Sequence, residues 1–162
     1  MYKVAIITAS DKGYAGERED KSGSVIEEIV TAHELEVTGK VILPDDRQIL
    51  SDQMLNYCHQ GIDLILTTGG TGFSKRDVTP EATADIVERR ADNLTFAMIA
   101  NSLQYTPKAM LSRGIAGIRE NTLIVNLPGS PKAVRENLEY AIDAIIHGVK
   151  ILKGDDAECA RK

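Results

Sequence analysis

The chain lacks the sequence features of secreted and membrane-spanning proteins. Its 162 residues include only two cysteines, Cys58 and Cys159, which lie far apart and form no CxxC pair. The sequence therefore predicts neither a zinc site nor a disulfide framework, and it favours a reducing compartment. No basic segment precedes an apolar one at the N-terminus, and no apolar run approaches the ~20 residues that span a bilayer. We therefore expect a cytoplasmic protein with no membrane partner.

A surplus of positive charge is also absent, which excludes another class of partner. The formal net charge is −5 at pH 7, and no run of lysine or arginine offsets it. Nonspecific binding of nucleic acid relies on such runs, so we expect no nucleic-acid partner. Hydrophobic residues make up 43% and charged residues 27% of the chain. These proportions are ordinary for a globular protein, and the length suits one domain.

Several familiar catalytic and nucleotide-binding motifs are absent. No glycine loop is followed by the Gly-Lys-Ser/Thr of a Walker P-loop. No G-x-G-x-x-G follows the first predicted strand, which disfavours a hydride-transferring enzyme. The histidines at positions 33, 59 and 147 share no spacing, so the sequence indicates no Ser-His-Asp or Cys-His arrangement.

The residues that are present alternate between short apolar runs and amphipathic segments. Apolar runs predict buried strands at residues 4–7, 36–43, 64–66 and 123–125. Helical spacing predicts helices capped by Ser22 or Ser24, between Asp46 and Gly61, from Thr79 to about Arg90, over 94–103, and before Gly154. The order β-α-β-α-β, with crossovers of helical length, predicts an α/β fold with a mostly parallel sheet.

The rest of the chain carries weaker patterns. Residues 8–16 have the composition of a polar loop, and Asp92 and Asn93 interrupt the helical pattern. Short runs at 109–113, 115–119 and 122–126 are interpreted as a hairpin that leads into the last strand. We expect a single domain over residues 1–154 and a polar tail over 155–162 that frays.

A glycine loop follows the third predicted strand, and it consists of Thr68, Gly69, Gly70, Thr71 and Gly72. Glycines allow positive φ angles and let a ligand approach the main chain closely. Free N–H groups, together with the threonine hydroxyls, suit a phosphate or another anion. A tight turn would need only one or two of the three glycines. The sequence therefore predicts an anion-binding loop.

Carboxylates follow two of the predicted strands. Asp77 precedes a helix, and Asp45 and Asp46 follow the second strand. Each of them, taken singly, is equally explained as a helix-start acid, a turn residue or an N-cap. However, the carboxyl ends of parallel strands meet at one edge of a sheet. Two acids that converge beside a phosphate loop are what Mg²⁺ with a nucleotide requires.

Two further polar segments are candidates for binding. The loop after the last strand resembles a second cradle, with Asn126, Pro128, Gly129, Ser130 and Lys132 as the candidate residues. An ordinary strand-to-helix connection with Pro131 at the first helical position explains it equally well. Near the N-terminus, the pairs Ser10-Asp11 and Ser22-Gly23 belong either to a solvated loop or to a flap over a ligand.

Together these motifs resemble the molybdopterin adenylyltransferase family, which is the MogA/MoaB group and includes the G domains of plant and animal proteins such as gephyrin. The resemblance rests on residues 67–72 (Thr-Thr-Gly-Gly-Thr-Gly), 76–83 (Arg-Asp-Val-Thr-Pro-Glu-Ala-Thr), 111–113 (Leu-Ser-Arg) and 126–132 (Asn-Leu-Pro-Gly-Ser-Pro-Lys). Ser10-Asp11 and residues 20–23 look like the family's opening motif. Many bacterial members carry a Glu and an Arg in the segment that corresponds to residues 92–99, and this chain lacks both.

The resemblance implies a three-layer α/β/α fold, a homotrimer and adenylyl transfer from Mg-ATP to molybdopterin. In that reaction Asp45 and Asp77 would be the essential acids and would hold Mg²⁺. The glycine loop would bind nucleotide phosphates, and residues 126–132 would help to hold substrate. Ser10, Asp11, Ser22 and Gly23 would contribute to the pterin pocket. The product would be passed to a molybdate-inserting enzyme. The alternative is a catalytically silent scaffold that binds pterin or nucleotide.

Overall fold

The computed structural model describes residues 1–155, so most of the predicted tail, residues 156–162, lies outside the described residues. The strands are β1 (Lys3–Ala9), β2 (Glu36–Leu43), β3 (Leu64–Thr68), β4 (Arg89–Arg90), β5 (Ala116–Arg119) and β6 (Thr122–Leu127). The helices are α1 (Asp11–Tyr14), α2 (Lys21–Ala32), α3 (Arg47–His59), α4 (Thr79–Ala84), α5 (Asp92–Ser102), the 3₁₀ helix η1 (Pro107–Leu111) and α6 (Pro131–Lys153).

One six-stranded sheet organises these elements, in the order β2-β1-β3-β6-β5-β4. The pairs β1–β2, β1–β3 and β3–β6 are parallel, whereas β5–β6 and β4–β5 are antiparallel. The prediction of a mostly parallel sheet is confirmed, and so is the hairpin that leads into the last strand. β6 enters the sheet beside β3, which brings the loops after these two strands together.

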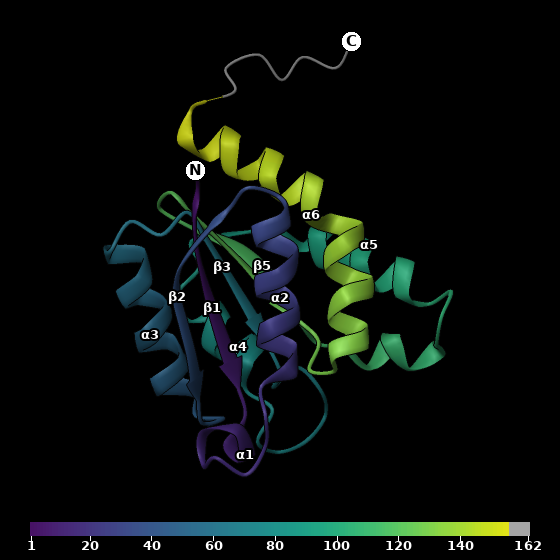
Figure 1. Ribbon diagram of the computed structural model, residues 1–162. Helices are drawn as coiled ribbons and strands as arrows, with labels where there is room; N and C mark the ends of the chain where they lie inside the picture. The colour runs from purple at the N-terminus through teal and green to yellow at the C-terminus, as the bar shows by residue number, and fades with distance from the viewer. Residues whose placement is uncertain (156–162) are drawn as a thin grey trace.

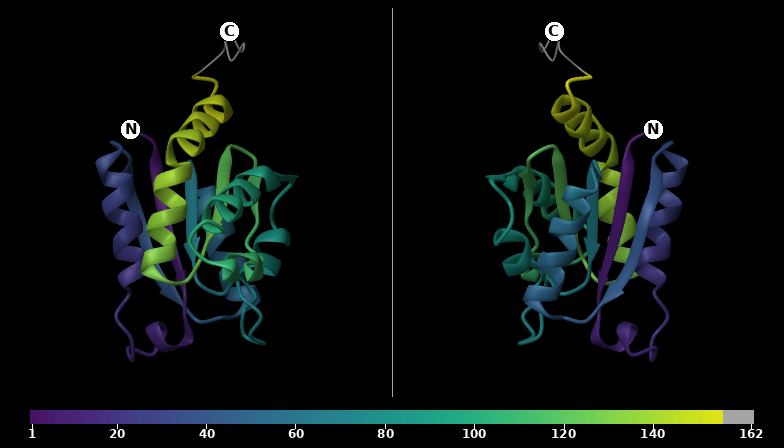
Figure 2. Two further views of the ribbon diagram at one scale, coloured as in Figure 1. Left: turned by 90° about the vertical axis from the view of Figure 1, so that its right-hand side faces the viewer. Right: turned by 90° about the vertical axis from the view of Figure 1, so that its left-hand side faces the viewer.

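Side chains alternate between the two faces of the sheet, and this alternation creates two cores. Val4 and Ile6 of β1 pack with apolar residues of α2, α5 and α6, whereas Ala5 and Ile7 pack with those of α3 and α4. In Figure 1, α3 lies to the left of the strands and α2, α5 and α6 lie to the right. Figure 2 views the molecule from these two sides. The three-layer α/β/α fold is therefore confirmed.

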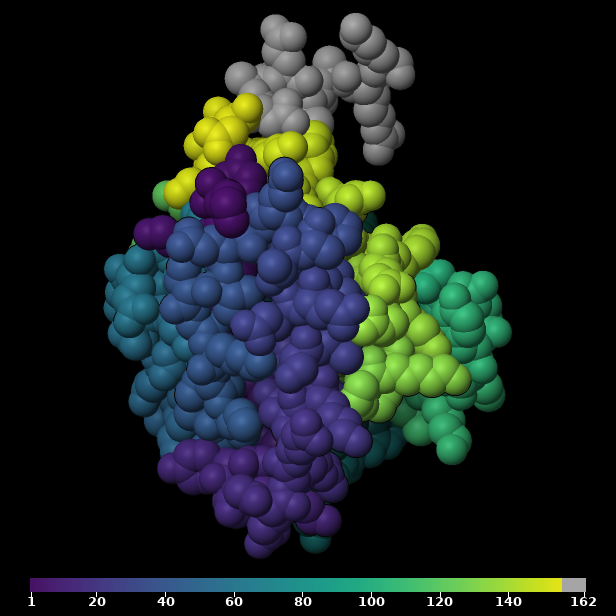
Figure 3. Space-filling model, in the orientation of Figure 1, coloured from purple at the N-terminus to yellow at the C-terminus, as the bar shows by residue number. Residues whose placement is uncertain are grey.

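The carboxyl ends of the parallel strands form one edge of the sheet. The arrowheads of β1, β2 and β3 point to the lower end of Figure 1, beside α1. At the opposite end, Asp63 accepts from the backbone N–H of Lys3 (2.8 Å) and pairs with Lys153 (2.9 Å). Tyr2 donates to Asp155 (2.7 Å), and Figure 3 shows the purple N-terminal residues against the yellow end of α6. These polar groups bind one another, whereas the loops that carry the predicted site residues leave the carboxyl edge.

Two predicted helix boundaries are wrong at their N-terminal ends. α2 is capped by Asp20, whose carboxylate accepts from Gly23 N (2.9 Å), so neither Ser22 nor Ser24 is the N-cap. α4 begins at Thr79 itself, with Val78 as an N-cap that makes no side-chain hydrogen bond. Here the N–H of Thr79 is taken by the carbonyl of Gly70 (3.1 Å), which draws the glycine loop onto the start of the helix.

Tertiary pairing explains the other differences from the predicted elements. α4 stops at Ala84 instead of about residue 90, because the N–H of Glu88 donates to Ile118 O (2.9 Å) and that of Ala91 to Ala116 O (2.9 Å). Residues 89–90 therefore form β4 at the edge of the sheet. Residues 8–16 complete β1 and form α1, residue 92 begins α5, and residues 107–111 form η1.

Across residues 1–155, no helix combines the length and the hydrophobicity that crossing a bilayer requires.

Candidate active site

The glycine loop needs its glycines for the turn that it makes. Gly69 and Gly70 have φ angles of 86° and 68°. A Cβ on Gly69 would lie 2.4 Å from the carbonyl oxygen of Ala9, and one on Gly70 would lie 2.3 Å from Thr79 Oγ1. Any other residue would therefore strain the backbone and collide with β1 or α4. Both glycines stay half-buried, so a ligand can reach the main chain of the loop.

The loop after β6 lies directly against the glycine loop. The hydroxyl of Thr68 donates to the carbonyl of Pro128 (2.6 Å), and that of Ser22 donates to the carbonyl of Gly129 (2.6 Å). A Cβ on Gly129 would stand only 3.5 Å from the Cα of Gly69. Three segments that are distant in the sequence, including the start of α2, are thus joined at one point of the sheet edge.

Asp11 uses its side chain for hydrogen bonds and an ion pair with residues of two neighbouring loops. Its carboxylate accepts from the N–H of Asp45 (3.0 Å), while its own N–H donates to Asp45 Oδ2 (3.0 Å). Arg76 adds a two-pronged contact to the same carboxylate (2.9 and 3.0 Å). The hydrogen bond from Arg76 is the main cause that lowers the pKa of Asp11. The structure therefore places Asp11 as a support of Asp45 and an anchor for the loop that carries Arg76.

Of the carboxylates of Asp11, Asp45 and Asp77, that of Asp45 has its negative charge least compensated by hydrogen bonds and neighbouring charges. Its Oδ1 is buried and has no hydrogen-bond partner in the described part of the chain. Burial is the largest cause that raises its pKa, and the negative charges of Asp11 and Asp77 raise it further. A bare oxygen in such a setting favours a proton or a cation. The hydroxyl of Thr79 is likewise buried without a partner in the described part of the chain, and a Cβ on Gly70 would lie 2.3 Å from this hydroxyl and 3.1 Å from Asp45 Oδ1.

Asp77 lies at the other end of the glycine loop. Its Oδ2 accepts from the N–H of Ser74 (3.0 Å), and a Cβ on Gly72 would stand 2.9 Å from the same oxygen. Its backbone carbonyl accepts from Arg113 (2.7 Å). Asp77 and Asp45 line the same hollow, so the expected convergence of the two acids is observed.

Two hollows open on either side of the glycine loop. The first, which we call the α1 hollow, has a volume of about 780 Å³ and lies between the loop and residues 8–22. The second, the α5 hollow, has a volume of about 460 Å³ and lies between the loop, α5, η1 and the start of α6. The residues that line both are Gly70, Asp77, Gly129 and Ser130. Ligands in the two hollows would therefore meet beside Asp77.

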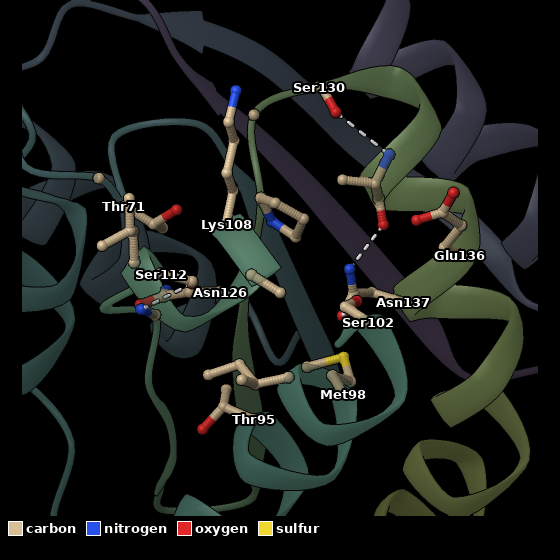
Figure 4. A pocket seen from close by; sticks show the side chains of 18 of the residues that line it. Thr71, Thr95, Met98, Ser102, Lys108, Ser112, Asn126, Ser130, Glu136 and Asn137 are labelled. Atoms are coloured by element: carbon tan, nitrogen blue, oxygen red, sulfur yellow. Dashed lines mark hydrogen bonds between the residues drawn. The ribbon is translucent and has the colours of Figure 1, made fainter. Parts of the chain in front are cut away.

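The α5 hollow combines apolar and polar walls. In Figure 4, Thr95 and Met98 of α5 lie at one end, and Lys108 lies across the hollow from Glu136 and Asn137 of α6. Lys108 is the only cationic side chain among the described residues that line this hollow.

Sequence reasoning did not single out several residues that line the α5 hollow, among them Lys108 and Ser112. Ser112 belongs to the Leu-Ser-Arg segment that carried the resemblance, so a signal for it was present. Nothing in the sequence pointed to Lys108, because its place follows from the packing of η1 beside the loop.

The remaining predicted residues differ in whether they line one of the two hollows. Ser10 and Ser22 line the α1 hollow. Asn126 lies beside the α5 hollow, but its amide is used internally: it donates to Thr67 (2.9 Å) and Thr83 (3.0 Å) and accepts from Ile115 N (3.0 Å).

Besides Asp11, two predicted residues line neither hollow. Gly23 packs against the carboxylate of Asp20, where a Cβ would stand 2.2 Å from Oδ2. Lys132 points into a separate surface groove with Arg135 and Tyr140, because its position in the first turn of α6 directs it away from the loop. The structure therefore does not bring Lys132 to the site.

The fold and the site define a class: an α/β protein with two acids beside a glycine loop at the carboxyl edge of a parallel sheet, which is an arrangement suited to anionic ligands. Residues 5–147 match the family described as the probable molybdopterin binding domain, and the chain belongs to this family. The family expected from the motifs is thus confirmed.

Individual relatives agree with this assignment. Gephyrin of Dictyostelium discoideum is 41% identical over 159 residues, which are 92% of this chain but only 22% of that longer protein. Molybdopterin adenylyltransferase of Helicobacter pylori (strain J99) is 38% identical over 155 residues, which cover 94% of this chain and 88% of that protein. The crystal structure of the molybdopterin biosynthesis enzyme MoaB from Thermus thermophilus is 42% identical, with a TM-score of 0.90 over 95% of this chain and 98% of that one.

Proposed function

We propose that this chain is a molybdopterin adenylyltransferase that transfers AMP from Mg-ATP to the terminal phosphate of molybdopterin. Relatives from Helicobacter pylori and Escherichia coli that bear this name are 38% and 35% identical to it over 94% and 91% of its length. The observation that carries the proposal is the meeting of the α1 and α5 hollows beside Asp77. A group-transfer reaction needs two substrates held side by side at one reacting atom.

In the proposed reaction, an oxygen of the molybdopterin phosphate attacks the α-phosphorus of ATP. A new P–O bond forms, the bond from the α-phosphorus to the α,β-bridging oxygen breaks, and pyrophosphate leaves. Such a transfer depends on positioning and on neutralising charge, so no protein nucleophile is needed. The N–H groups of residues 69–72 would bind nucleotide phosphates. Ser10 and Ser22 would contact the pterin, and Gly129 and Ser130 would lie where the substrates meet.

Asp45 and Asp77 are the residues that would hold Mg²⁺. The buried, unpartnered Oδ1 of Asp45 fits a cation, since positive charge would offset the cost of its burial. Within residues 1–155, no three acidic, histidine or cysteine side chains gather to form a complete metal site. Two carboxylates suit Mg²⁺, because this ion takes few protein ligands and completes its shell with phosphate oxygens and water. When bound, the ion would stabilise the charge on the reacting phosphates.

The direct test is incubation of the purified chain with molybdopterin and Mg-ATP, with mass spectrometry of the pterin and a pyrophosphate assay. We expect one pyrophosphate for each adenylylated pterin. Excess chelator should stop the reaction, and added Mg²⁺ should restore it. A folded protein that binds both substrates and releases no pyrophosphate would support the scaffold alternative instead. Activity that persists in excess chelator would show that the reaction does not need Mg²⁺.

We further propose that the chain forms a homotrimer in the cytoplasm. A homotrimer is supported by the family resemblance and by exposed apolar side chains on α5 and η1, such as Phe96 (71% exposed) and Met110 (64% exposed). We propose a cytoplasmic location on the basis of the cysteine usage, and a hand-off of the adenylylated product to a molybdate-inserting enzyme on the basis of the resemblance.

A further inference from the structure

Arg113 concentrates its contacts on a single stretch of chain. It lies between η1 and β5, and its hydrogen bonds go to residues between 71 and 81. Its backbone N–H donates to the carbonyl of Thr71 (2.8 Å). From its guanidinium, Nε donates to the carbonyl of Gly72 (2.8 Å), Nη2 to that of Asp77 (2.7 Å), and Nη1 to the carboxylate of Glu81.

These contacts close the two ends of one loop. Residues 73–76, between Gly72 and Asp77, are exposed, and Phe73 is 71% exposed. The loop is held from inside by a turn in which Asp77 N donates to Ser74 O (3.0 Å) and Ser74 N to the Asp77 carboxylate (3.0 Å). The planar guanidinium fixes the distance between the carbonyls at the two ends. It thereby fixes where the Asp77 carboxylate enters the site.

Arg113 lies outside both hollows in which the substrates are proposed to bind. It instead lines a shallow outer surface together with Phe73, Asp77 and Glu81. Its influence on chemistry must therefore pass through the loop that it holds. Glu81, in the first turn of α4, orients the guanidinium from the other side, since the pair is half-buried and the bond is charge-assisted.

We infer that Arg113, oriented by Glu81, is a positioning residue that sets the Asp77 carboxylate for nucleotide binding and adenylyl transfer. This inference rests on the proposed function. Lysine cannot replace arginine here, because one ammonium lacks the rigid fork that serves two carbonyls and a carboxylate together. A loop end displaced by about 1 Å is enough to lower a rate by about 10²-fold.

The test compares Arg113→Lys with Arg119→Lys. Arg119 is a matched control, because it is also half-buried and donates to a backbone carbonyl, that of Ile86 (2.8 Å), but it does not touch the loop. We expect Arg113→Lys to lower kcat at least tenfold with a much smaller change in the KM for molybdopterin. Arg119→Lys should keep kcat within about twofold. Arg113→Ala should regain part of its activity when guanidinium is added at millimolar concentration.

A binding cycle separates positioning from general damage and does not depend on turnover. Mg-ATP affinity is measured by calorimetry for the wild type, Arg113→Lys, Asp77→Asn and the double variant. If Arg113 acts through Asp77, the double variant should bind no more weakly than Asp77→Asn alone. Additive losses, or an Arg113→Lys protein that matches Arg119→Lys in both kcat and affinity, would overturn the inference. If the cycle is non-additive but the wild type makes no adenylylated pterin, the proposed activity is refuted, while the positioning of Asp77 by Arg113 is supported.

Discussion

At the scale of single residues, Asp45 and Asp77 differ in how the protein uses their oxygens. Asp77 accepts a hydrogen bond from the N–H of Ser74, and its position is fixed by the loop that carries it. Asp45 is held by the N–H of Asp11 through one oxygen, while the other is buried without a partner. Asp77 is thus placed by backbone geometry, whereas Asp45 carries a charge that the folded protein alone compensates poorly.

Replacing Asp45 should therefore stabilise the protein while it inactivates it. Burial raises the pKa of Asp45 in the folded state. Folding then favours the protonated acid, so its contribution to stability falls as pH rises from the ordinary Asp range through the folded pKa. We expect Asp45→Asn to melt a few degrees above the wild type at pH 7 without Mg²⁺. The difference should shrink toward pH 4, as measured by calorimetry across pH.

Asp85 provides a control of opposite sign. Its pKa is lowered by the hydrogen bonds from Arg47, so it contributes stability above its ordinary pKa and loses it as pH falls through the folded value. Asp85→Asn should be slightly less stable than the wild type at pH 7, and the gap should close in acid. The pair is exposed, so the effect is small. An Asp45→Asn protein that is less stable than the wild type at every pH would contradict the account of Asp45.

Asp77→Asn should abolish turnover with the fold intact. The amide keeps an oxygen for the N–H of Ser74, so the loop retains its turn, but the negative charge for Mg²⁺ is lost. We expect kcat/KM to fall by about 10²-fold or more, with a melting temperature within a few degrees of the wild type. Asp52→Asn, on the exposed face of α3, is the matched control. Activity of Asp77→Asn near that of the control would remove Asp77 from the mechanism.

At the scale of elements, the turn from β3 into the glycine loop offers a comparison between two glycines with similar backbones. Gly61 and Gly69 have φ angles of 76° and 86°. A Cβ on Gly61 meets nothing within 4 Å, whereas one on Gly69 lies 2.4 Å from the carbonyl of Ala9. For Gly61→Ala the only expected cost is the left-handed backbone conformation, about 1–2 kcal/mol of unfolding free energy. This corresponds to a fall in melting temperature of roughly 2–8 °C in a protein of this size.

Gly69→Ala should be clearly more destabilising than Gly61→Ala, because the added methyl group also pushes β1 away from the loop. Thermal melts of the two variants beside the wild type would measure the difference. Equal losses would mean that the loop relaxes freely and that its close approach to β1 is unimportant.

The sequence was a good guide to elements whose cause is local. Asp46 caps α3 as predicted, Gly154 ends α6, and β2 has the predicted bounds. It failed where distant backbone decides the outcome. The pairing of Glu88 and Ala91 with β5 cannot be read from the helical pattern that precedes them.

The same distinction applies to the site. The glycine loop was predicted from its three glycines, and the convergence of Asp45 and Asp77 from the shared edge at which parallel strands end. However, the internal use of the Asn126 amide, the direction of Lys132 and the contribution of Lys108 depend on packing between elements that the sequence does not reveal.

At the scale of the whole molecule, we expect the proposed trimer to form through the surface of α5 and η1. Phe96, Tyr105 and Met110 are each more than half exposed there. Burial of such large side chains is a main source of association energy. Sedimentation should give three times the chain mass. Phe96→Asp should shift the protein toward monomer, whereas Tyr14→Asp, at the exposed end of α1, should not. A wild type that sediments as a monomer at micromolar concentration would contradict the trimer.

The position of β6 in the sheet has a consequence for the newly made chain. A ribosome releases residues in order, so β1, β2 and β3 are available long before β6, which is the last strand within residues 1–155 but lies between β3 and β5. Until β6 arrives, β3 keeps an open edge, and Thr68 and Ser22 lack the carbonyls of residues 128 and 129. Translation therefore completes the candidate site only after the loop that follows β6 has been made, and a chain that stops before β6 lacks the residues at which the two hollows meet.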